Sequence, residues 1–184
     1  MKPYVSIMKG TIIGVDRRKA SWRDGGVAAT RYERCHPGAR KSSRAEDIHM
    51  HVDYWNDDQG VDVKGNNLPD EIWVELKNVN GLHGWLFGEA TIIAFDMPEL
   101  AGFVVVDRED LKDYCKENVN FVGLVNKSDA YKRCYTRRGR KDIITMLVLS
   151  DLQQLKSYHV VKYNTTYIHP KTRKSCSVCE KSVS

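Results

Sequence analysis

Three side chains from two neighbouring apolar segments could together hydrolyse a phosphodiester. Asp62 lies in the segment GVDVK, and Glu75 and Lys77 lie in the segment EIWVELK that follows it. Successive side chains of a strand point to opposite faces, so Glu75 and Lys77 share one face while Leu76 points into the core. If the two strands pair, Asp62 approaches Glu75 and forms an oxygen-rich pocket, to which Leu76 can add its backbone carbonyl.

Such a pocket suits a hard divalent cation. Mg²⁺ is commonly held by one or two carboxylates, with water and substrate phosphate completing its shell, and Mn²⁺ would also fit. The cation would polarise a phosphoryl oxygen and acidify a bound water, while Lys77 orients that water or offsets developing charge. The simpler alternative for Asp62, Glu75 and Lys77 is a surface salt bridge across two strands, which contributes little energy.

The arrangement D…E-x-K on successive strands resembles the PD-(D/E)XK nuclease superfamily, in particular its small bacteriophage-type members, over about residues 45–110. The resemblance implies a restriction-endonuclease-like core and a Mg²⁺-dependent nuclease that hydrolyses phosphodiester bonds in nucleic acid, with DNA the expected substrate. It implies that Asp62 and Glu75 hold the metal and that Lys77 assists the attacking water. The proline that usually precedes the first acid is replaced by Val61.

Many members of that superfamily add a glutamate from the preceding helix. Glu46 and Glu33 are the two candidates for this additional acid. The stretch Ser43-Arg44-Ala45-Glu46 also has the form of a capping box, in which serine and glutamate satisfy free N–H groups at the start of a helix. Glu46 therefore has a structural role available to it as well.

The elements needed to position these residues can be read from the hydrophobic pattern. The predicted fold is α/β, a single domain over residues 1–168 with its core at about 43–160, in which helices flank one mixed central sheet. A basic, cysteine-containing tail, residues 169–184, is predicted to be flexible. Strands are expected at 51–55, 60–64, 71–77, 90–95, 102–106 and 144–149, with a further pair or hairpin within 4–16. Helices are expected at 28–35, after Ser43, from Asp107 to about Lys116, and after Ser150.

Charge divides the chain into three blocks. Residues 1–44 carry 11 basic and 3 acidic groups, residues 45–110 carry 3 and 15, and residues 111–184 carry 15 and 6. An acidic centre could hold a cation while basic flanks attract phosphates, although a solvated surface with clustered charges explains the pattern equally well. The densest basic cluster is predicted to contact a nucleic-acid backbone, with a solvated loop as the alternative: Lys132, Arg133, Arg137, Arg138, Arg140 and Lys141.

Composition excludes several classes of protein. Hydrophobic residues make up 41% of the 184 residues and charged residues 29%, which suits one globular core. No run approaches the ~18 apolar residues of a spanning helix, and the start resembles no secretory signal. We therefore expect a cytoplasmic protein, in the host cell if the chain is viral, with no membrane partner. Five scattered cysteines indicate free thiols, and Cys176 and Cys179 form only half of a zinc site, so zinc is not expected.

Two further questions stay open at this level. The segment His83 to Gly88 could present Trp85 and Phe87 to bases in a substrate groove, although packing of both rings in the core is the favoured interpretation. The alternative to an enzyme is an inactive nuclease-like module that binds nucleic acid or inhibits a partner protein. DNA against RNA, internal against terminal cleavage, and monomer against homodimer are not decided by the sequence.

Overall fold

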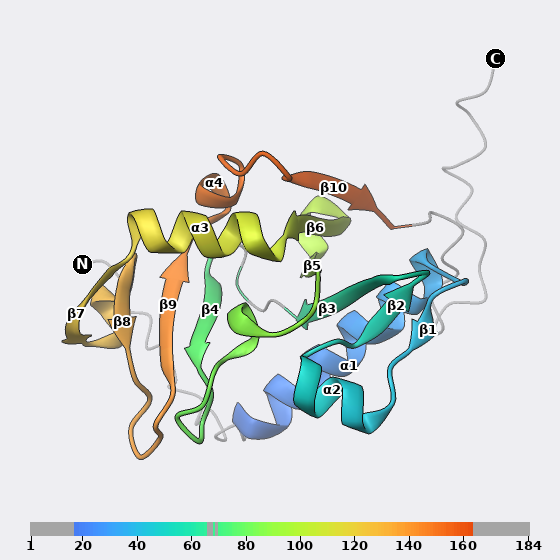
Figure 1. Cartoon of the computed structure of the whole chain (residues 1–184). Helices are drawn as coiled ribbons and strands as arrows, with labels where there is room; N and C mark the ends of the chain where they lie inside the picture. The colour runs from blue at the N-terminus through green and yellow to red at the C-terminus, as the bar shows by residue number, and fades with distance from the viewer. Residues whose placement is uncertain (1–16, 66–67, 69, 164–184) are drawn as a thin grey trace, which may run out of the picture.

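The protein is described by a computed structural model that covers residues 17–65, 68 and 70–163. It is an α/β structure whose strands, within these residues, form a six-stranded sheet of order β1-β2-β3-β5-β6-β10 and a four-stranded sheet of order β4-β9-β8-β7 (Figure 1). Both sheets mix parallel and antiparallel pairs. The α/β class predicted from the sequence is confirmed, but the expectation of one central sheet is wrong.

The elements follow one another along the chain as helices, strands and short 3₁₀ turns (η). The first half contains α1 (Arg17–Cys35), β1 (Arg40–Lys41), α2 (Arg44–Met50), β2 (Tyr54–Asn56), β3 (Gln59–Gly65), β4 (Ile72–Lys77), η1 (Trp85–Phe87), β5 (Ile92–Met97) and η2 (Pro98–Leu100). The second half contains β6 (Gly102–Asp107), α3 (Arg108–Asn118), β7 (Asn120–Val125), η3 (Lys127–Asp129), β8 (Arg133–Tyr135), β9 (Ile143–Leu147), α4 (Leu149–Leu152) and β10 (His159–Lys162).

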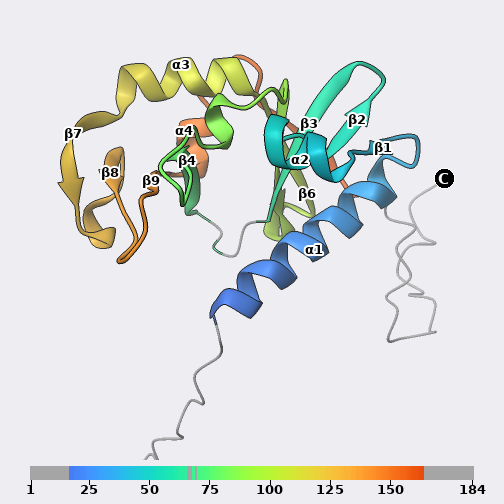
Figure 2. The ribbon, with the colours of Figure 1, turned by 60° about the horizontal axis from the view of Figure 1, so that its bottom comes forward.

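Helix α1 covers one face of the six-stranded sheet (Figure 2). Ala28 and Tyr32 of the helix pack against Tyr54, Val61 and other apolar side chains that point to this face. The helix ends at Cys35, as expected from the His-Pro-Gly sequence that follows it. It begins eleven residues earlier than the apolar pattern predicted, at Arg17 rather than Ala28, because the sequence before Ala28 is polar, contains two glycines and has no apolar periodicity.

The opposite face of the six-stranded sheet packs into the larger core, which it shares with the four-stranded sheet and α3. Ile93 and Phe95 of β5 belong to this core together with Val74 of β4 and Leu147 of β9. Helix α3 runs across the upper end of the four-stranded sheet in Figure 1 and buries Leu111 on the same core. The two sheets are therefore joined through side chains rather than through a continuous hydrogen-bonded ladder.

Several local predictions are confirmed. Strands β2 and β3 form an antiparallel hairpin, and Asp57 at its turn has a left-handed backbone with φ of 53°. Ser43 caps α2 with the reciprocal serine–glutamate contacts of a capping box. In β4, Ile72, Val74 and Leu76 are buried as the alternation predicted, while the intervening side chains lie on the other face.

Strand β7 forms an edge of the four-stranded sheet and pairs only with β8 among the described strands. It contains no charged residue. Its apolar side chains are exposed, Val122 to 83% and Phe121 to 50%. The edge is thus unusually apolar for a surface strand.

The structure also bears on the class of protein. No helix in the described part of the chain is long and apolar enough to cross a membrane. Cys35, Cys115 and Cys134 are free thiols, as predicted. The predicted hairpin within 4–16, the tail 169–184 and the pair Cys176 and Cys179 lie outside the described residues.

Candidate active site

The structure separates the residues of the predicted triad between the two sheets. Asp62 lies on β3, whose neighbours are β2 and β5, whereas Glu75 lies on β4, which pairs with β9. The expected pairing of these two strands was wrong. The register with β9 shifts between Glu75 and Lys77, and the carbonyl of Leu76 accepts a hydrogen bond from the N–H of Gly84 at 3.1 Å. Glu75 and Lys77 keep the face opposite to the buried Leu76, but the strand pairing that was expected to bring Asp62 to them is absent among the described strands.

Asp62 is nevertheless the most unusual carboxylate in the described structure. It is only 2% exposed and points into the space between the sheets, on the face of β3 that carries the larger core. Its Oδ1 lies 2.7 Å from the Nζ of Lys64, and its Oδ2 meets no donor among the described residues, although the carboxyls of Asp62 and Asp53 are close enough to share a hydrogen bond when one of them is protonated. Burial raises the pKa of Asp62, while the charge of Lys64 opposes that rise.

A second carboxylate faces Asp62 across the hairpin. Tyr54 pairs with Val61, so the antiparallel register places Asp53, one residue earlier, opposite Asp62. The Oδ2 of Asp53 accepts a hydrogen bond from the N–H of Val63 at 2.8 Å. Burial, reinforced by the negative charge of Asp62, raises the pKa of Asp53 to about 6. The hairpin thus brings together two acids whose charges destabilise each other.

The lysine of this site is Lys64. It stands two residues after Asp62, so both side chains lie on the same face of β3. Its Nζ also lies 5.1 Å from the centre of the Trp85 ring, a cation–π contact that holds the ammonium over the turn η1. Asp53, Asp62 and Lys64 therefore form one cluster, which we call the hairpin cluster.

His51 and Glu75 border the hairpin cluster. His51 follows α2 in a left-handed conformation with φ of 54°, and burial together with the nearby charge of Lys64 lowers the pKa of its imidazole. The charge of Glu75 acts on His51 in the opposite direction, which places β4 beside the cluster. Glu75 is thus a neighbour of the site even though its strand does not pair with β3.

The two candidates for an additional acid have other partners. Glu46 accepts from the N–H of Ser43 at 2.7 Å and pairs with Arg40 at 2.9 Å, which lowers its pKa to about 2. Glu33 accepts from the hydroxyl of Tyr54 at 2.8 Å, on the face of the sheet that α1 covers and opposite to Asp62. Among the described residues, no three histidine, cysteine, aspartate or glutamate side chains are arranged to hold a metal ion.

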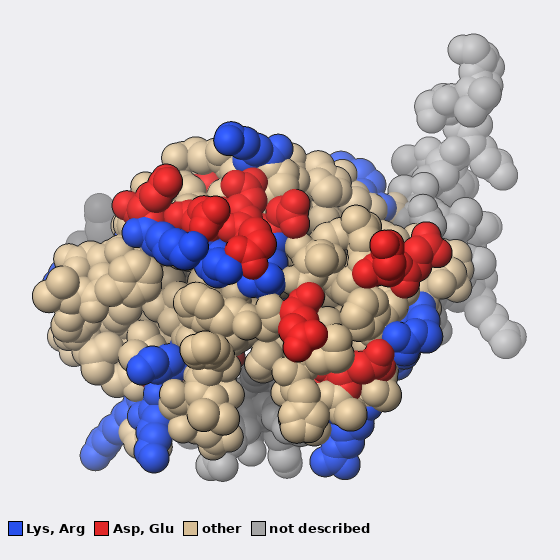
Figure 3. Space-filling model, viewed as in Figure 1, with Lys and Arg blue, Asp and Glu red and all other residues tan. Residues whose placement is uncertain are grey.

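The basic cluster is divided by its ion pairs. Lys132 pairs with the buried Asp151 at 2.8 Å, and Arg137 pairs with the buried Asp142, so these two cations serve the fold. Arg138, Arg140 and Lys141 are exposed at the end of the β8–β9 hairpin, where basic side chains project at the lower left of Figure 3. Arg133 is exposed on β8. Acidic side chains on the same face of the molecule lie in several groups rather than one patch (Figure 3).

Sequence reasoning passed over Asp53 and Lys64. The signal for both was present, because Asp62-Val63-Lys64 is itself an acid–x–lysine strand and Asp53 stands nine residues before Asp62, at the start of the same predicted hairpin. Comparison of the chain with protein-family models, curated proteins and solved structures found no match.

Proposed function

We propose that the protein is a metal-dependent nuclease whose active site is the hairpin cluster Asp53, Asp62 and Lys64. The observation that carries this proposal is the buried Asp62, with one carboxylate oxygen unpaired and a second carboxylate opposite it. Burying two like charges costs several kcal/mol, about the size of a whole domain's margin of stability. Strongly shifted carboxylates in such a cluster are typical of functional sites.

The residues present fit a hard divalent cation. Asp53 and Asp62 would supply two carboxylates, which is the number that Mg²⁺ commonly takes from a protein when water and substrate phosphate fill its other positions. This accounts for a site with two acids rather than three. The bound cation would polarise the phosphoryl group and lower the pKa of a coordinated water.

The chain's own groups would do the remaining work. Asp53 and Asp62 orient the cation because the hairpin fixes both carboxylates on one side. Lys64 places an ammonium beside them, where it can donate to the attacking water or offset the negative charge that develops on the phosphate. Trp85 beneath Lys64 restricts the lysine to this position.

The cluster also fits the superfamily resemblance better than the predicted triad. An acid on one strand followed by acid–x–lysine on the next corresponds here to Asp53 and to Asp62-Val63-Lys64, on two strands that do pair. Val52 then occupies the position of the usual proline. A restriction-endonuclease-like core and a nucleic-acid substrate follow from this assignment as parts of the same proposal. The exposed cations Arg138, Arg140 and Lys141 would contribute contacts to the phosphate backbone.

The proposal is tested by cleavage of circular and linear DNA and of RNA, with Mg²⁺ and with chelator. Asp53→Asn, Asp62→Asn and Lys64→Met should each lower the cleavage rate at least about 100-fold. Lys77→Met should lower it far less than Lys64→Met, which separates the hairpin cluster from the predicted triad. Asp58→Asn, an exposed acid in the turn of the same hairpin, is the matched control and should keep full activity.

A second measurement, of thermal stability, tests metal binding without measuring cleavage. Mg²⁺ should raise the unfolding temperature of the wild-type protein and of Asp58→Asn but not that of Asp62→Asn. Full cleavage activity in Asp53→Asn and Lys64→Met, or no cleavage of any of these substrates by the wild-type protein with Mg²⁺, would overturn the proposal. The second outcome would favour the inactive module that binds nucleic acid.

A further inference from the structure

The turn η1 has one aromatic ring inside the protein and one outside. Trp85, its first residue, is 6% exposed, whereas Phe87, its last, is 41% exposed. Core packing therefore accounts for the first ring only. Packing in the core does not explain why the ring of Phe87 is exposed to solvent.

The turn is fitted directly against the hairpin cluster. Trp85 lies under the ammonium of Lys64. Gly84, just before the turn, lies so close to β4 that an added Cβ would be 2.3 Å from the carbonyl oxygen of Glu75. Gly88, just after it, would place a Cβ 2.7 Å from the Cβ of His51. Both ends of the turn thus touch residues that border the cluster.

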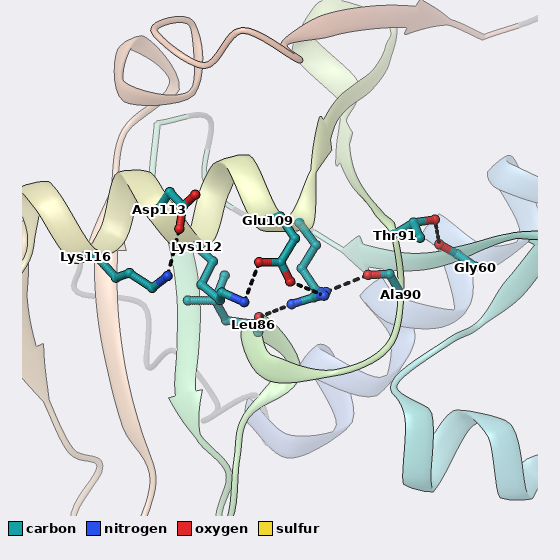
Figure 4. A network of polar contacts seen from close by, with 9 residues as sticks. Gly60, Leu86, Ala90, Thr91, Glu109, Lys112, Asp113 and Lys116 are labelled. Atoms are coloured by element: carbon teal, nitrogen blue, oxygen red, sulfur yellow. Dashed lines mark hydrogen bonds and ion pairs between the residues drawn. The ribbon is translucent and has the colours of Figure 1, made fainter.

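The turn is also held in place by the first residue of α3. Arg108, the first residue of α3, donates through Nε to the carbonyl of Ala90 at 2.6 Å and through Nη1 to the carbonyl of Leu86 at 3.1 Å, the two carbonyls drawn in Figure 4. One guanidinium therefore fixes the chain on both sides of Phe87. A ring on such a support loses little conformational entropy when it binds a ligand.

Phe87 has an aromatic neighbour, and the loop that precedes it reaches the basic hairpin. The ring of His83 lies 5.5 Å from that of Phe87, at an angle of 41°. Further along the same loop, the carbonyl of Val79 accepts a hydrogen bond from the N–H of Lys141 at 3.4 Å, so the loop touches the basic end of the β8–β9 hairpin. The loop that carries His83 and Phe87 is therefore anchored at its start to a segment with exposed cations.

We infer that Phe87, with His83 beside it, is a stacking platform for an unpaired base, and that the substrate is therefore single-stranded nucleic acid. This inference rests on the proposed function. The face of every base can stack on an aromatic ring, but only an unpaired base has that face free, since in a duplex it is covered by its neighbours. The platform thus distinguishes single-stranded from double-stranded nucleic acid but does not distinguish one base from another.

The test is binding in chelator, where no cleavage takes place. Fluorescence anisotropy compares a labelled single-stranded oligonucleotide with a blunt duplex of the same sequence. Phe87→Leu keeps apolar bulk but removes the ring, and should weaken single-strand binding about tenfold while leaving duplex binding unchanged. Phe87→Trp, which keeps an aromatic ring, should bind the single strand as tightly as the wild-type protein or more tightly.

Phe121→Leu is the matched control, because Phe121 is a similarly exposed phenylalanine on β7, and it should bind like the wild-type protein. Equal single-strand affinity in Phe87→Leu and the wild type, or equal losses for single strand and duplex, would overturn the inference. If Phe87 is needed for single-strand binding but the wild-type protein shows no Mg²⁺-dependent cleavage, the proposed function is refuted and the inference about Phe87 is retained.

Discussion

At the scale of single residues, the pair Asp53 and Asp62 works against folding when no cation is bound. Asp62 is buried, Asp53 is partly buried, and the two carboxylates face each other; the ammonium of Lys64 and the N–H of Val63 compensate only in part. Such a pair is relieved by a proton or by a cation, so proton binding and metal binding should compete at this site.

This competition predicts how stability depends on pH. The pKa of Asp53 is about 6 in the folded protein against 3.8 for an unperturbed aspartate, so the folded state binds the proton more tightly. The stabilisation is complete below the unfolded value and is lost as pH rises through the folded value, a change of order 2 kcal/mol between about pH 4 and pH 7. Urea unfolding in chelator should show this loss in the wild type and in Asp58→Asn and a smaller one in Asp53→Asn, where only the raised pKa of Asp62 remains. A loss of the same size in Asp53→Asn and the wild type would contradict the assignment.

The sequence contains the whole hairpin cluster, yet the residues could be assigned only in part. Asp62 was predicted to lie on the second strand of a hairpin, and that placement is confirmed, whereas its role as a metal ligand stays a prediction. The second acid was sought on the next strand along the chain, because neighbours in sequence usually pair. The place of Asp53 opposite Asp62 depends on the register of the β2–β3 hairpin, which the hydrophobic pattern alone does not give.

At the scale of elements, the close packing of η1 against β4 decides the shape of the site. Gly84 permits this packing because it has no side chain. Its backbone has an ordinary extended conformation with φ of −80°, so glycine is needed here for the lack of space and not for its backbone conformation.

Gly84→Ala should therefore displace the turn from Glu75. We expect a loss of about 2 to 3 kcal/mol in the free energy of unfolding, the usual cost of inserting a methyl group against fixed backbone. Thermal or urea unfolding measures it. Gly38→Ala is the control, because a Cβ at Gly38 meets nothing within 4 Å. Equal stability of the two variants would show that η1 can shift without cost.

Most elements could be predicted because each has a local signal. The alternation in β4, the capping box of α2 and the acidic first turn of α3 are all readable within a few residues. The division into two sheets is not local. It depends on β4 pairing with β9, about seventy residues away, and on β3 pairing in parallel with β5 instead. A hydrophobic pattern gives the faces of a strand but not its neighbours.

At the scale of the whole molecule, the candidate site lies where the two sheets meet rather than within either one. The β2–β3 hairpin supplies the acids and the lysine, while the four-stranded sheet supplies the strand and loop that carry η1. The larger core, with Val74 of β4 and Ile93 of β5, holds these two parts together. Loosening that core should therefore affect the site even where no residue of the cluster is changed.

The outer edge of the four-stranded sheet has a separate consequence. Six consecutive residues of β7 carry no charge, and nothing in the described chain covers them. An uncharged, apolar edge readily adds another strand, so concentrated protein should form oligomers whose size grows with concentration. Val122→Lys, at the most exposed position, should suppress this growth in sedimentation velocity, whereas equal behaviour of the variant and the wild type would exclude β7 as the cause.

Because β7 contributes no residue to the hairpin cluster, the tendency of the protein to form oligomers can be changed without changing the cluster. A single lysine on this edge strand should improve the yield of dispersed protein for crystallisation or spectroscopy without changing any residue of the hairpin cluster.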